Sequence, residues 1–133
     1  MTQSMSLEMQ RGLQALTTCK KTCTTTLSYY LHSNTQDRDL SLMCLLRDCA
    51  EMCLMSTNLM IDGSEFMGRT FLICAEMCDR CAAACEIYSD DPQMMACAEA
   101  CHACSQYCSS MGRLSSAYFR RPNFDTFEAL VAS

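Results

Sequence analysis

Two segments of the chain repeat one cysteine pattern, CxxxCxxCxxxC, and this repeat constrains the fold more than any other feature. The first run covers residues 74–85 and the second covers residues 97–108. Spacings of four, three and four residues are those of neighbouring a and d positions in a heptad, so each run lines one face of a helix with thiols. The runs therefore predict two similar helices whose cysteine faces point into a bundle.

Shorter versions of the pattern occur in the first half of the chain. Cys19 and Cys23 are four residues apart, as are Cys49 and Cys53. Cys44 precedes the second pair by five residues, which rotates it away by about 140° at ~100° per residue. Four segments thus supply sulfur, and their common axis is predicted to carry thiols where leucine and isoleucine usually interlock.

Turn and capping residues divide the chain into four predicted helices. Gly63 supplies a left-handed exit from the second helix, and Ser64 is placed to cap the third. Asp91 followed by Pro92 is a strong start signal for the fourth helix. The predicted helices cover about residues 6–31, 37–61, 65–88 and 92–118.

Short connections between helices of similar length favour antiparallel neighbours. We therefore expect an all-α single domain over residues 1–133, an antiparallel up-down-up-down four-helix bundle with a cysteine-lined core. Asp125 is placed to start a short C-terminal helical tail through Leu130, whose aromatic neighbours would pack on the bundle or on another subunit.

Charge and hydropathy exclude two classes of partner. The formal net charge is −5 and the basic residues form no long run, which argues against a nucleic-acid surface. No apolar stretch approaches the roughly 20 residues that span a bilayer, so no membrane insertion is expected. The first ten residues lack the basic start and apolar region of an export signal, and we expect a cytoplasmic location, where dense cysteine indicates metal or redox chemistry.

Thiolate is a soft ligand that selects Cu(I), Zn(II) or iron–sulfur clusters. A Cu(I) ion held by two sulfurs in line spans roughly twice a metal–sulfur distance of ~2.3 Å, taking the zinc value as a proxy. Residues four apart on a helix, with Cβ atoms about 5–6 Å apart, can straddle that gap. If each sulfur bridges two ions, the lattice is electrically neutral at one Cu(I) per cysteine, with a ceiling of about thirteen ions. Zn(II) on four thiolates would leave two negative charges per site.

All thirteen cysteines are therefore candidate Cu(I) ligands. They are Cys19, Cys23, Cys44, Cys49, Cys53, Cys74, Cys78, Cys81, Cys85, Cys97, Cys101, Cys104 and Cys108.

The two ends of such a bundle differ in their residues. One end gathers thioethers and an imidazole, which are weaker, exchangeable Cu(I) ligands suited to an entrance: His32, Met43, Met94 and Met95. The other end is predicted to form a dry apolar plug that stabilises the fold. Its residues are Leu7, Met9, Leu13, Leu59, Met60, Ile61, Phe66, Phe71, Leu72, Leu114 and Phe119.

These motifs resemble those of the bacterial copper storage proteins, and the chain is most similar to their cytosolic branch. The residues that carry the resemblance are Cys19-Lys-Lys-Thr-Cys23, Cys49-Ala-Glu-Met-Cys53 and the two CxxxCxxCxxxC runs. The resemblance implies a homotetramer of bundles that bind Cu(I) on inward cysteines for copper homeostasis, with no catalytic chemistry. Leu42, Phe71 and Met94 stand where longer cysteine rows would continue, which implies a lower capacity than in the most cysteine-rich members.

Two alternative functions remain open at this point. A cytosolic thiol redox protein would use Cys78-Asp-Arg-Cys81 or Cys101-His-Ala-Cys104, although neither lies at a predicted helix N-terminus where thiolate is favoured. A zinc- or cadmium-buffering protein would use the same thiolates at a lower metal count. His102 lies beside the cysteine stripe, and the sequence leaves open whether it is a ligand or a surface residue.

Overall fold

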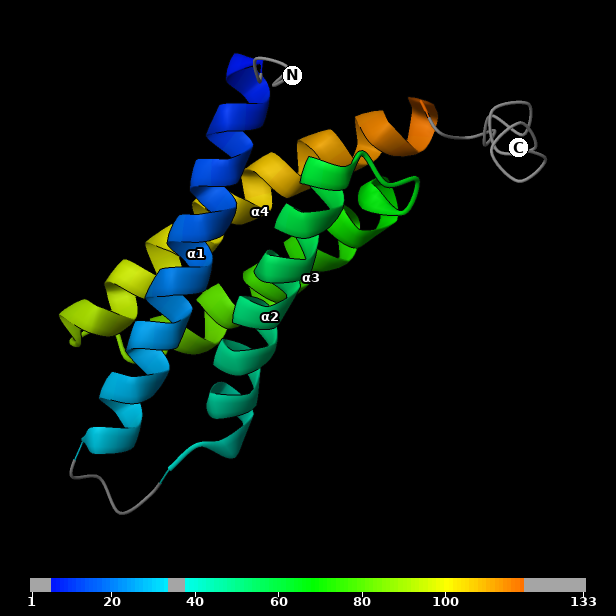
Figure 1. The fold of residues 1–133 in the computed structure, drawn as a ribbon. Coiled ribbons are helices and arrows are strands. Elements are labelled where there is room, and N and C mark those ends of the chain that lie inside the picture. The colour runs from blue at the N-terminus through cyan, green and yellow to red at the C-terminus, as the bar shows by residue number, and fades with distance from the viewer. Residues whose placement is uncertain (1–5, 34–37, 119–133) are drawn as a thin grey trace.

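A computed structural model describes residues 6–33 and 38–118. It contains four helices (Figure 1): α1 (Leu7–His32), α2 (Leu40–Asp62), α3 (Met67–Glu86) and α4 (Pro92–Tyr118). The described residues form no strand, and the all-α prediction is confirmed. Each helix begins and ends within about three residues of its predicted bounds. The predicted C-terminal tail, with Asp125 and Leu130, lies outside the described residues.

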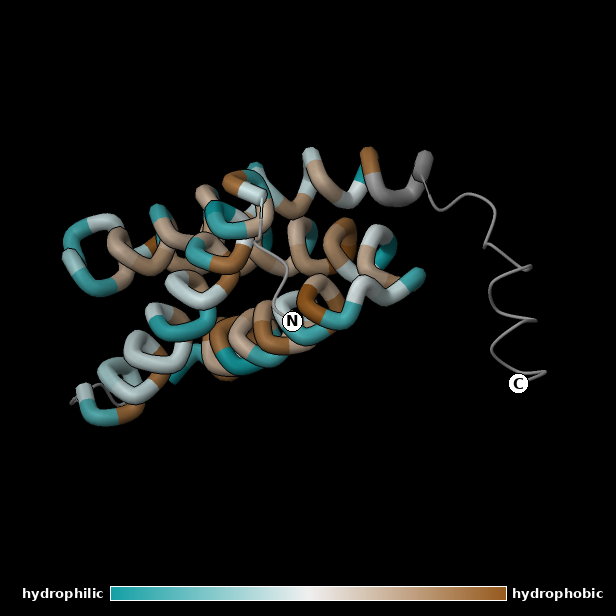
Figure 2. Tube along the Cα trace, turned by 45° about the horizontal axis from the view of Figure 1, so that its top comes forward, coloured by the Kyte–Doolittle hydropathy of each residue, from teal (hydrophilic) through white to brown (hydrophobic). Residues whose placement is uncertain are grey.

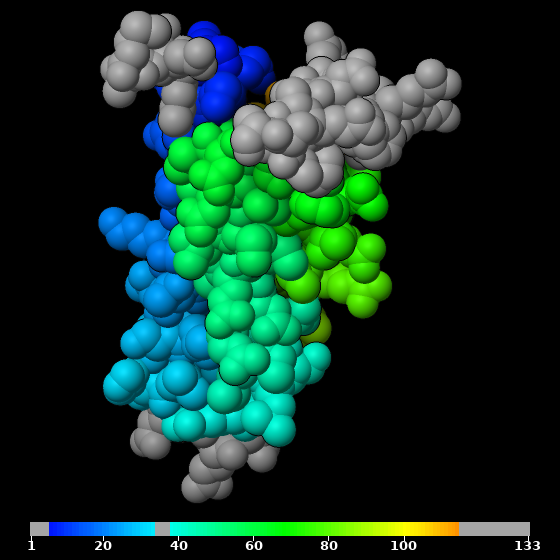
Figure 3. Space-filling view, turned by 45° about the vertical axis from the view of Figure 1, so that its right-hand side comes forward, coloured from blue at the N-terminus to red at the C-terminus, as the bar shows by residue number. Residues whose placement is uncertain are grey.

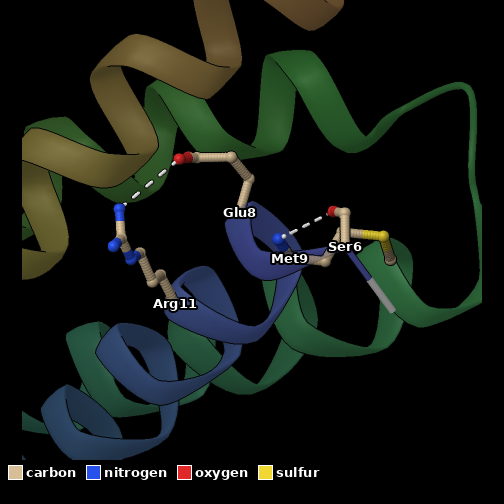
Figure 4. A network of polar contacts seen from close by, with 4 residues as sticks. All are labelled: Ser6, Glu8, Met9 and Arg11. Atoms are coloured by element: carbon tan, nitrogen blue, oxygen red, sulfur yellow. Dashed lines mark hydrogen bonds and ion pairs between the residues drawn. The ribbon is translucent and has the colours of Figure 1, made fainter. Parts of the chain in front are cut away.

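Capping side chains begin three of the helices. Ser6 accepts a hydrogen bond from the Met9 amide at 3.2 Å (Figure 4), which satisfies one of the free amides at the start of α1. The Glu8–Arg11 ion pair beside it, at 3.7 Å, is exposed and adds little stability. Asp39, two residues after the predicted start, caps α2.

The predicted start of α4 is confirmed, because Asp91 Oδ1 accepts hydrogen bonds from the amides of Gln93 and Met94. The α2 exit is also confirmed, with Gly63 at φ +66°. The prediction that Ser64 caps α3 is wrong. Its hydroxyl accepts from the Phe66 amide within a turn, and α3 begins only at Met67 without a side-chain cap.

The helices alternate in direction around the core. Each packs against the next along the chain and α4 packs against α1, while the diagonal pairs make no close backbone contact in the described residues. This is the predicted up-down-up-down topology. Figure 1 shows the α3–α4 hairpin lying obliquely across the α1–α2 hairpin, and Figure 3 shows α1, α2 and α3 adjoining one another on one face.

Side-chain contacts define the two ends of the bundle. At the Tyr30 end, where α1 and α3 finish, the Tyr30 and Tyr88 rings meet edge to face at 6.1 Å, and Tyr29 donates to Asp91 at 2.9 Å. At the opposite Phe71 end, the rings of Phe71 and Tyr107 lie 5.9 Å apart. The Tyr107 ring lies so close to Gly12 that any side chain there would overlap it, so the glycine makes room for this ring between α1 and α4.

The apolar plug predicted at the Phe71 end is smaller than expected. Phe71 and Met60 are buried, and Met9, Leu13 and Leu59 are partly buried. Phe119 lies outside the described residues. The prediction is wrong for five exposed residues, because rotation about each helix, and not position along it, decides which side chains reach the core. These are Leu7, Ile61, Phe66, Leu72 and Leu114.

Hydropathy follows the same arrangement along the trace. Figure 2 shows hydrophilic and apolar residues alternating along all four helices. Among the described residues, no helix is both long enough and apolar enough to cross a bilayer. The interior is therefore built from one inward stripe per helix, and that stripe consists largely of cysteine.

Candidate metal centre

Twelve cysteines lie inside the bundle with no exposed surface. α1 and α2 each contribute two of them, and α3 and α4 each contribute four. The predicted inward orientation of both CxxxCxxCxxxC runs is therefore confirmed. All thirteen cysteines fall within the described ranges and all are free thiols, so no disulfide joins the helices.

Small residues beside the cysteines let the helices come close together. Ala75, Ala82 and Ala98 each follow an inward cysteine and are buried, and Ser105 follows Cys104 in the same way. Interaxial distance depends on the side chains at the contact, so these positions bring α3 and α4 near enough for their sulfurs to meet. The Cys-Ala dipeptide, which occurs four times in the sequence, is a signal of this close packing that the cysteine spacing alone does not contain.

Neighbouring sulfurs lie 3.6–4.0 Å apart along the core. Cys19 occupies the centre, because its Sγ meets sulfurs from all four helices. The partners of Cys19 are Cys23 at 4.0 Å, Cys49 at 3.9 Å, Cys78 at 3.9 Å and Cys101 at 3.8 Å.

The sulfurs form four overlapping groups, in each of which all Sγ atoms lie within 4.8 Å of one another. Neighbouring groups share members. The Cys74 and Cys53 groups share Cys104, the Cys53 and Cys49 groups share Cys19, and the Cys49 and Cys97 groups share both Cys23 and Cys101. The groups thus form one continuous string of eleven sulfurs along the bundle axis, and the buried Cys85 extends it at one end beside Cys81 and Cys97. They are Cys74-Cys104-Cys108, Cys19-Cys53-Cys78-Cys104, Cys19-Cys23-Cys49-Cys101 and Cys23-Cys81-Cys97-Cys101.

The sulfur spacing limits how ions can be held. With metal–sulfur distances of ~2.3 Å, two sulfurs in line would be about 4.6 Å apart, and three around one ion about 4.0 Å apart. The pairs Cys19–Cys23 at 4.0 Å and Cys104–Cys108 at 3.9 Å are close to the three-sulfur value. A two-sulfur clamp on one helix, as the sequence predicted, requires the pair to open by roughly half an ångström or more.

Several thiols of the metal-free core are held in the protonated form by their surroundings. Hydrogen bonding to Cys104 and other neighbouring thiols, together with burial, raises the pKa of Cys78 well above its usual range. Hydrogen bonding to Cys19 and its neighbours, with burial, does the same for the pKa of Cys101. No basic side chain among the described residues is buried. Thiolates formed here therefore need bound cations to balance their charge.

Cys44 lies apart from the other twelve cysteines. It is exposed on α2, and none of the sulfur groups found in the described residues includes it. The reason is the rotation of about 140° that separates it from the inward pair on its own helix. The structure thus gives Cys44 no partner ligand in the core.

The four predicted entrance residues do not converge on one site. His32 is exposed and its Nδ1 lies 2.7 Å from the Ser28 carbonyl oxygen. Met43 is partly buried, Met95 is largely exposed, and only Met94 is buried in the core. The Tyr30 end is closed by the Tyr30–Tyr88 pair described above, and the Tyr30 hydroxyl accepts from the Asp39 amide at 2.8 Å.

His102 lies on the surface, where its Nε2 is 3.4 Å from Glu86 Oε1, so it faces away from the sulfurs. Sequence reasoning missed two inward residues that do face the core. Thr26 and Ser56 are fully buried, and each follows an inward cysteine by three residues. The heptad spacing that placed the cysteines could have found these hydroxyls as well.

Comparison with known proteins links this arrangement to somewhat shorter proteins of the same fold. A family model described as copper storage protein matches residues 5–113. The uncharacterized cysteine-rich protein YhjQ of Bacillus subtilis is 30% identical over 99 residues, which cover 74% of this chain and 91% of YhjQ. The Cu(I)-bound copper storage protein BsCsp3 is 28% identical, with a TM-score of 0.75, covering 79% of this chain and 98% of its own. A solved structure from Nitrosospira multiformis is 30% identical, with a TM-score of 0.73, covering 80% and 96%.

Proposed function

Because this chain belongs to the copper storage protein family, we propose that it binds and stores multiple Cu(I) ions on the inward thiolates of its bundle. The observation that carries this function is the continuous string of eleven buried sulfurs in overlapping groups, with the buried Cys85 at one end of it. The Cu(I)-bound state of a structural relative, BsCsp3, supports it. Storage of copper in this form would keep the free ion scarce.

Charge balance favours Cu(I) over Zn(II) in this core. Each Cu(I) that binds displaces one thiol proton, so one ion per inward cysteine leaves the interior neutral, at about twelve ions per chain. Sulfurs shared between groups suit ions that accept bridging thiolates. The four-sulfur groups also match the ligand number of Zn(II), but each such site would retain two negative charges with no buried base to offset them.

Anaerobic titration of the reduced protein with Cu(I) against a strong chelator tests this function. We expect about ten to twelve equivalents to be taken up before the chelator competes. Saturation at two or three equivalents, with tighter uptake of Zn(II), would favour a zinc-type buffer. Negligible metal uptake with a reversible dithiol couple would contradict storage and favour a redox protein.

The location and assembly of the protein are part of the same proposal. Thirteen free thiols persist in a reducing compartment, which supports a cytoplasmic location. The exposed apolar side chains on α2 and α3, among them Leu54, Ile61 and Ile73, are available to the homotetramer that the family resemblance implies. The inward cysteines are fully enclosed, and membership of the copper storage family supports storage without catalysis.

A further inference from the structure

Each end of the sulfur string carries a buried hydroxyl. At the Phe71 end, Cys53 Sγ lies 3.9 Å from Cys104 Sγ, so these residues occupy one layer. Cys108 and Ser56 follow these two residues by four and three positions, which places both one turn nearer the Phe71 end. Ser56 has 0% exposure, and its hydroxyl has no hydrogen-bond partner.

The Tyr30 end repeats this arrangement. Cys23 and Cys81 belong to one sulfur group, and Thr26 and Cys85 follow them by three and four residues, which places both one turn nearer the Tyr30 end. Thr26 has 0% exposure, and its Oγ1 accepts a hydrogen bond from Gln93 Nε2 at 2.9 Å. Its own hydroxyl hydrogen is therefore free to point into the core.

The two end layers have matching compositions. In each, the α3–α4 hairpin supplies the last cysteine of the string and the α1–α2 hairpin supplies the hydroxyl. Exchanging α1 with α2 and α3 with α4 converts one layer into the other. The buried apolar residues nearest to these layers include Leu16 and Phe71 at one end, Leu42 and Met94 at the other.

A string of bridged ions leaves its charge unbalanced at the ends. A sulfur in the middle of the string lies between two Cu(I) ions, whereas the last sulfur has an ion on one side only and keeps more negative charge. An uncompensated buried charge is strongly unfavourable, and no basic side chain is buried among the described residues. Ser56 and Thr26 are the side-chain hydroxyls with 0% exposure among the described residues, and a hydroxyl is a donor that a thiolate accepts.

We propose that Ser56 and Thr26 cap the two ends of the loaded string by donating hydrogen bonds to the Cys108 and Cys85 thiolates. The proposal rests on the proposed storage of Cu(I). When an ion binds, the thiol loses its proton to solvent and its sulfur becomes a charged acceptor. The Ser56 hydroxyl, which lacks a partner in the metal-free protein, then gains one.

The test compares Ser56→Ala with Ser105→Ala. Ser105 is also buried, but its hydroxyl already donates to Asp79 Oδ1 at 2.5 Å, outside the sulfur string. We expect metal-free Ser56→Ala to unfold at the same temperature as wild type or higher, because an unsatisfied polar group is removed. After loading, a chelator should remove about one ion roughly tenfold more readily than from wild type. Ser105→Ala should show the reverse, a lower melting temperature and unchanged copper retention.

A second variant tests the proposal through a gain in copper capacity. Ser56→Cys places a sulfur beside Cys108 and should raise the capacity by about one ion. Equal copper retention by wild type and Ser56→Ala, or a metal-free Ser56→Ala protein that melts earlier, as Ser105→Ala should, would overturn the capping role alone. A wild-type protein that takes up no Cu(I) would instead overturn the storage function on which the proposal rests.

Discussion

The two hairpins of the bundle contribute different things to one core. The α3–α4 hairpin supplies eight inward thiols, and small residues beside them let its helices pack closely. The α1–α2 hairpin supplies four inward thiols together with three buried leucines and both end hydroxyls. One hairpin is thus specialised for sulfur, while the other encloses that sulfur and supplies much of the apolar contact that stabilises the metal-free fold.

The smaller set of thiols nevertheless occupies the middle of the string. Cys19 and Cys23 on α1 each belong to two sulfur groups, as Cys101 and Cys104 on α4 do, whereas Cys74 and Cys108 belong only to the terminal one. The number of thiols on a hairpin therefore does not measure its importance for metal binding. What matters is how many groups each sulfur joins.

The largest expected effect follows from removing all four inward thiols of α1 and α2, by changing Cys19, Cys23, Cys49 and Cys53 to alanine. Three of the four sulfur groups then lose at least one member, and the two central groups lose most. Capacity should fall from about twelve Cu(I) to about eight or fewer, and the ions that remain should be lost more readily to a chelator. Anaerobic competition titration measures both quantities.

The matched control removes four thiols from the other hairpin. Changing Cys74, Cys85, Cys97 and Cys108 to alanine leaves both central groups complete. The capacity should again fall by about four ions, but the remaining ions should keep wild-type affinity. Indistinguishable affinities in the two quadruple variants would show that position along the string is unimportant.

Two residues in one layer of the core are expected to affect different properties, one the stability of the metal-free protein and the other metal binding. Leu46 and Cys81 stand in the same layer on different hairpins, and both are fully buried. Leu46→Ala should reduce the unfolding free energy of the metal-free protein by about 3 kcal/mol, because it leaves a cavity, while copper capacity stays the same. Denaturant unfolding followed by circular dichroism, with a parallel copper titration, measures the two effects.

Cys81→Ala is the control in that layer. It removes one sulfur and less apolar surface, so it should destabilise the metal-free protein by about 1 kcal/mol and lower the capacity by about one ion. A Leu46→Ala protein that lost as much copper as Cys81→Ala would contradict the division of labour between the hairpins.

The cysteine stripes and the helix order could be predicted because both depend on local spacing. Residues four and three apart share a face whatever surrounds them, and Asp91-Pro92 starts a helix by its own chemistry. The exposed side chains of Ile61 and Leu114 could not be predicted from their place along the helix. Their burial depends on how each helix is rotated against its neighbours, which the sequence pattern at the helix ends left undetermined.

The same limit applies to the details of the candidate site. The predicted entrance rested on residues that lie at one end of the bundle, but the contact between Tyr30 and Tyr88 that closes this end joins residues far apart in the sequence. Thr26 and Ser56 were overlooked for another reason. The role of a buried hydroxyl can be inferred only when the positions of the surrounding sulfurs are known, because its proposed partner lies on another helix.

A smaller effect is expected from alkaline pH, and it should arise mainly in the α3–α4 hairpin. Folding raises the pKa of five of its thiols and lowers the pKa of two, Cys74 and Cys97. The five stay protonated after the thiols of an unfolded chain ionise at about pH 8.5. The stability they provide is fully present below that pH and is lost as pH rises towards the folded pKa, by up to about 1.4 kcal/mol per pH unit for each thiol. These thiols are Cys78, Cys85, Cys101, Cys104 and Cys108.

Thermal unfolding of the metal-free protein between pH 8 and 10 measures this loss. Loading with Cu(I) displaces the protons, so the loaded protein should show a much flatter pH dependence over the same range. The alanine variants of Cys78 and Cys101 should each reduce the slope. A metal-free protein whose stability is constant over this range would show that the core thiols ionise as freely as those of the unfolded chain.

The smallest expected effect concerns Cys44. It compares an exposed cysteine with an inward cysteine on the same helix. Cys44 and Cys49 lie five residues apart on α2, but only Cys49 reaches the string, with its sulfur 3.6 Å from that of Cys78. Cys44→Ser should therefore leave the copper capacity unchanged and alter stability by at most about 0.5 kcal/mol, as is usual for surface substitutions. Cys49→Ala should lower the capacity by about one ion in the same titration. Because the two residues share a helix and a side-chain type, a difference between the variants isolates the rotation of about 140° as its cause. Loss of an ion from Cys44→Ser would mean that the loaded protein recruits a ligand from outside the bundle axis.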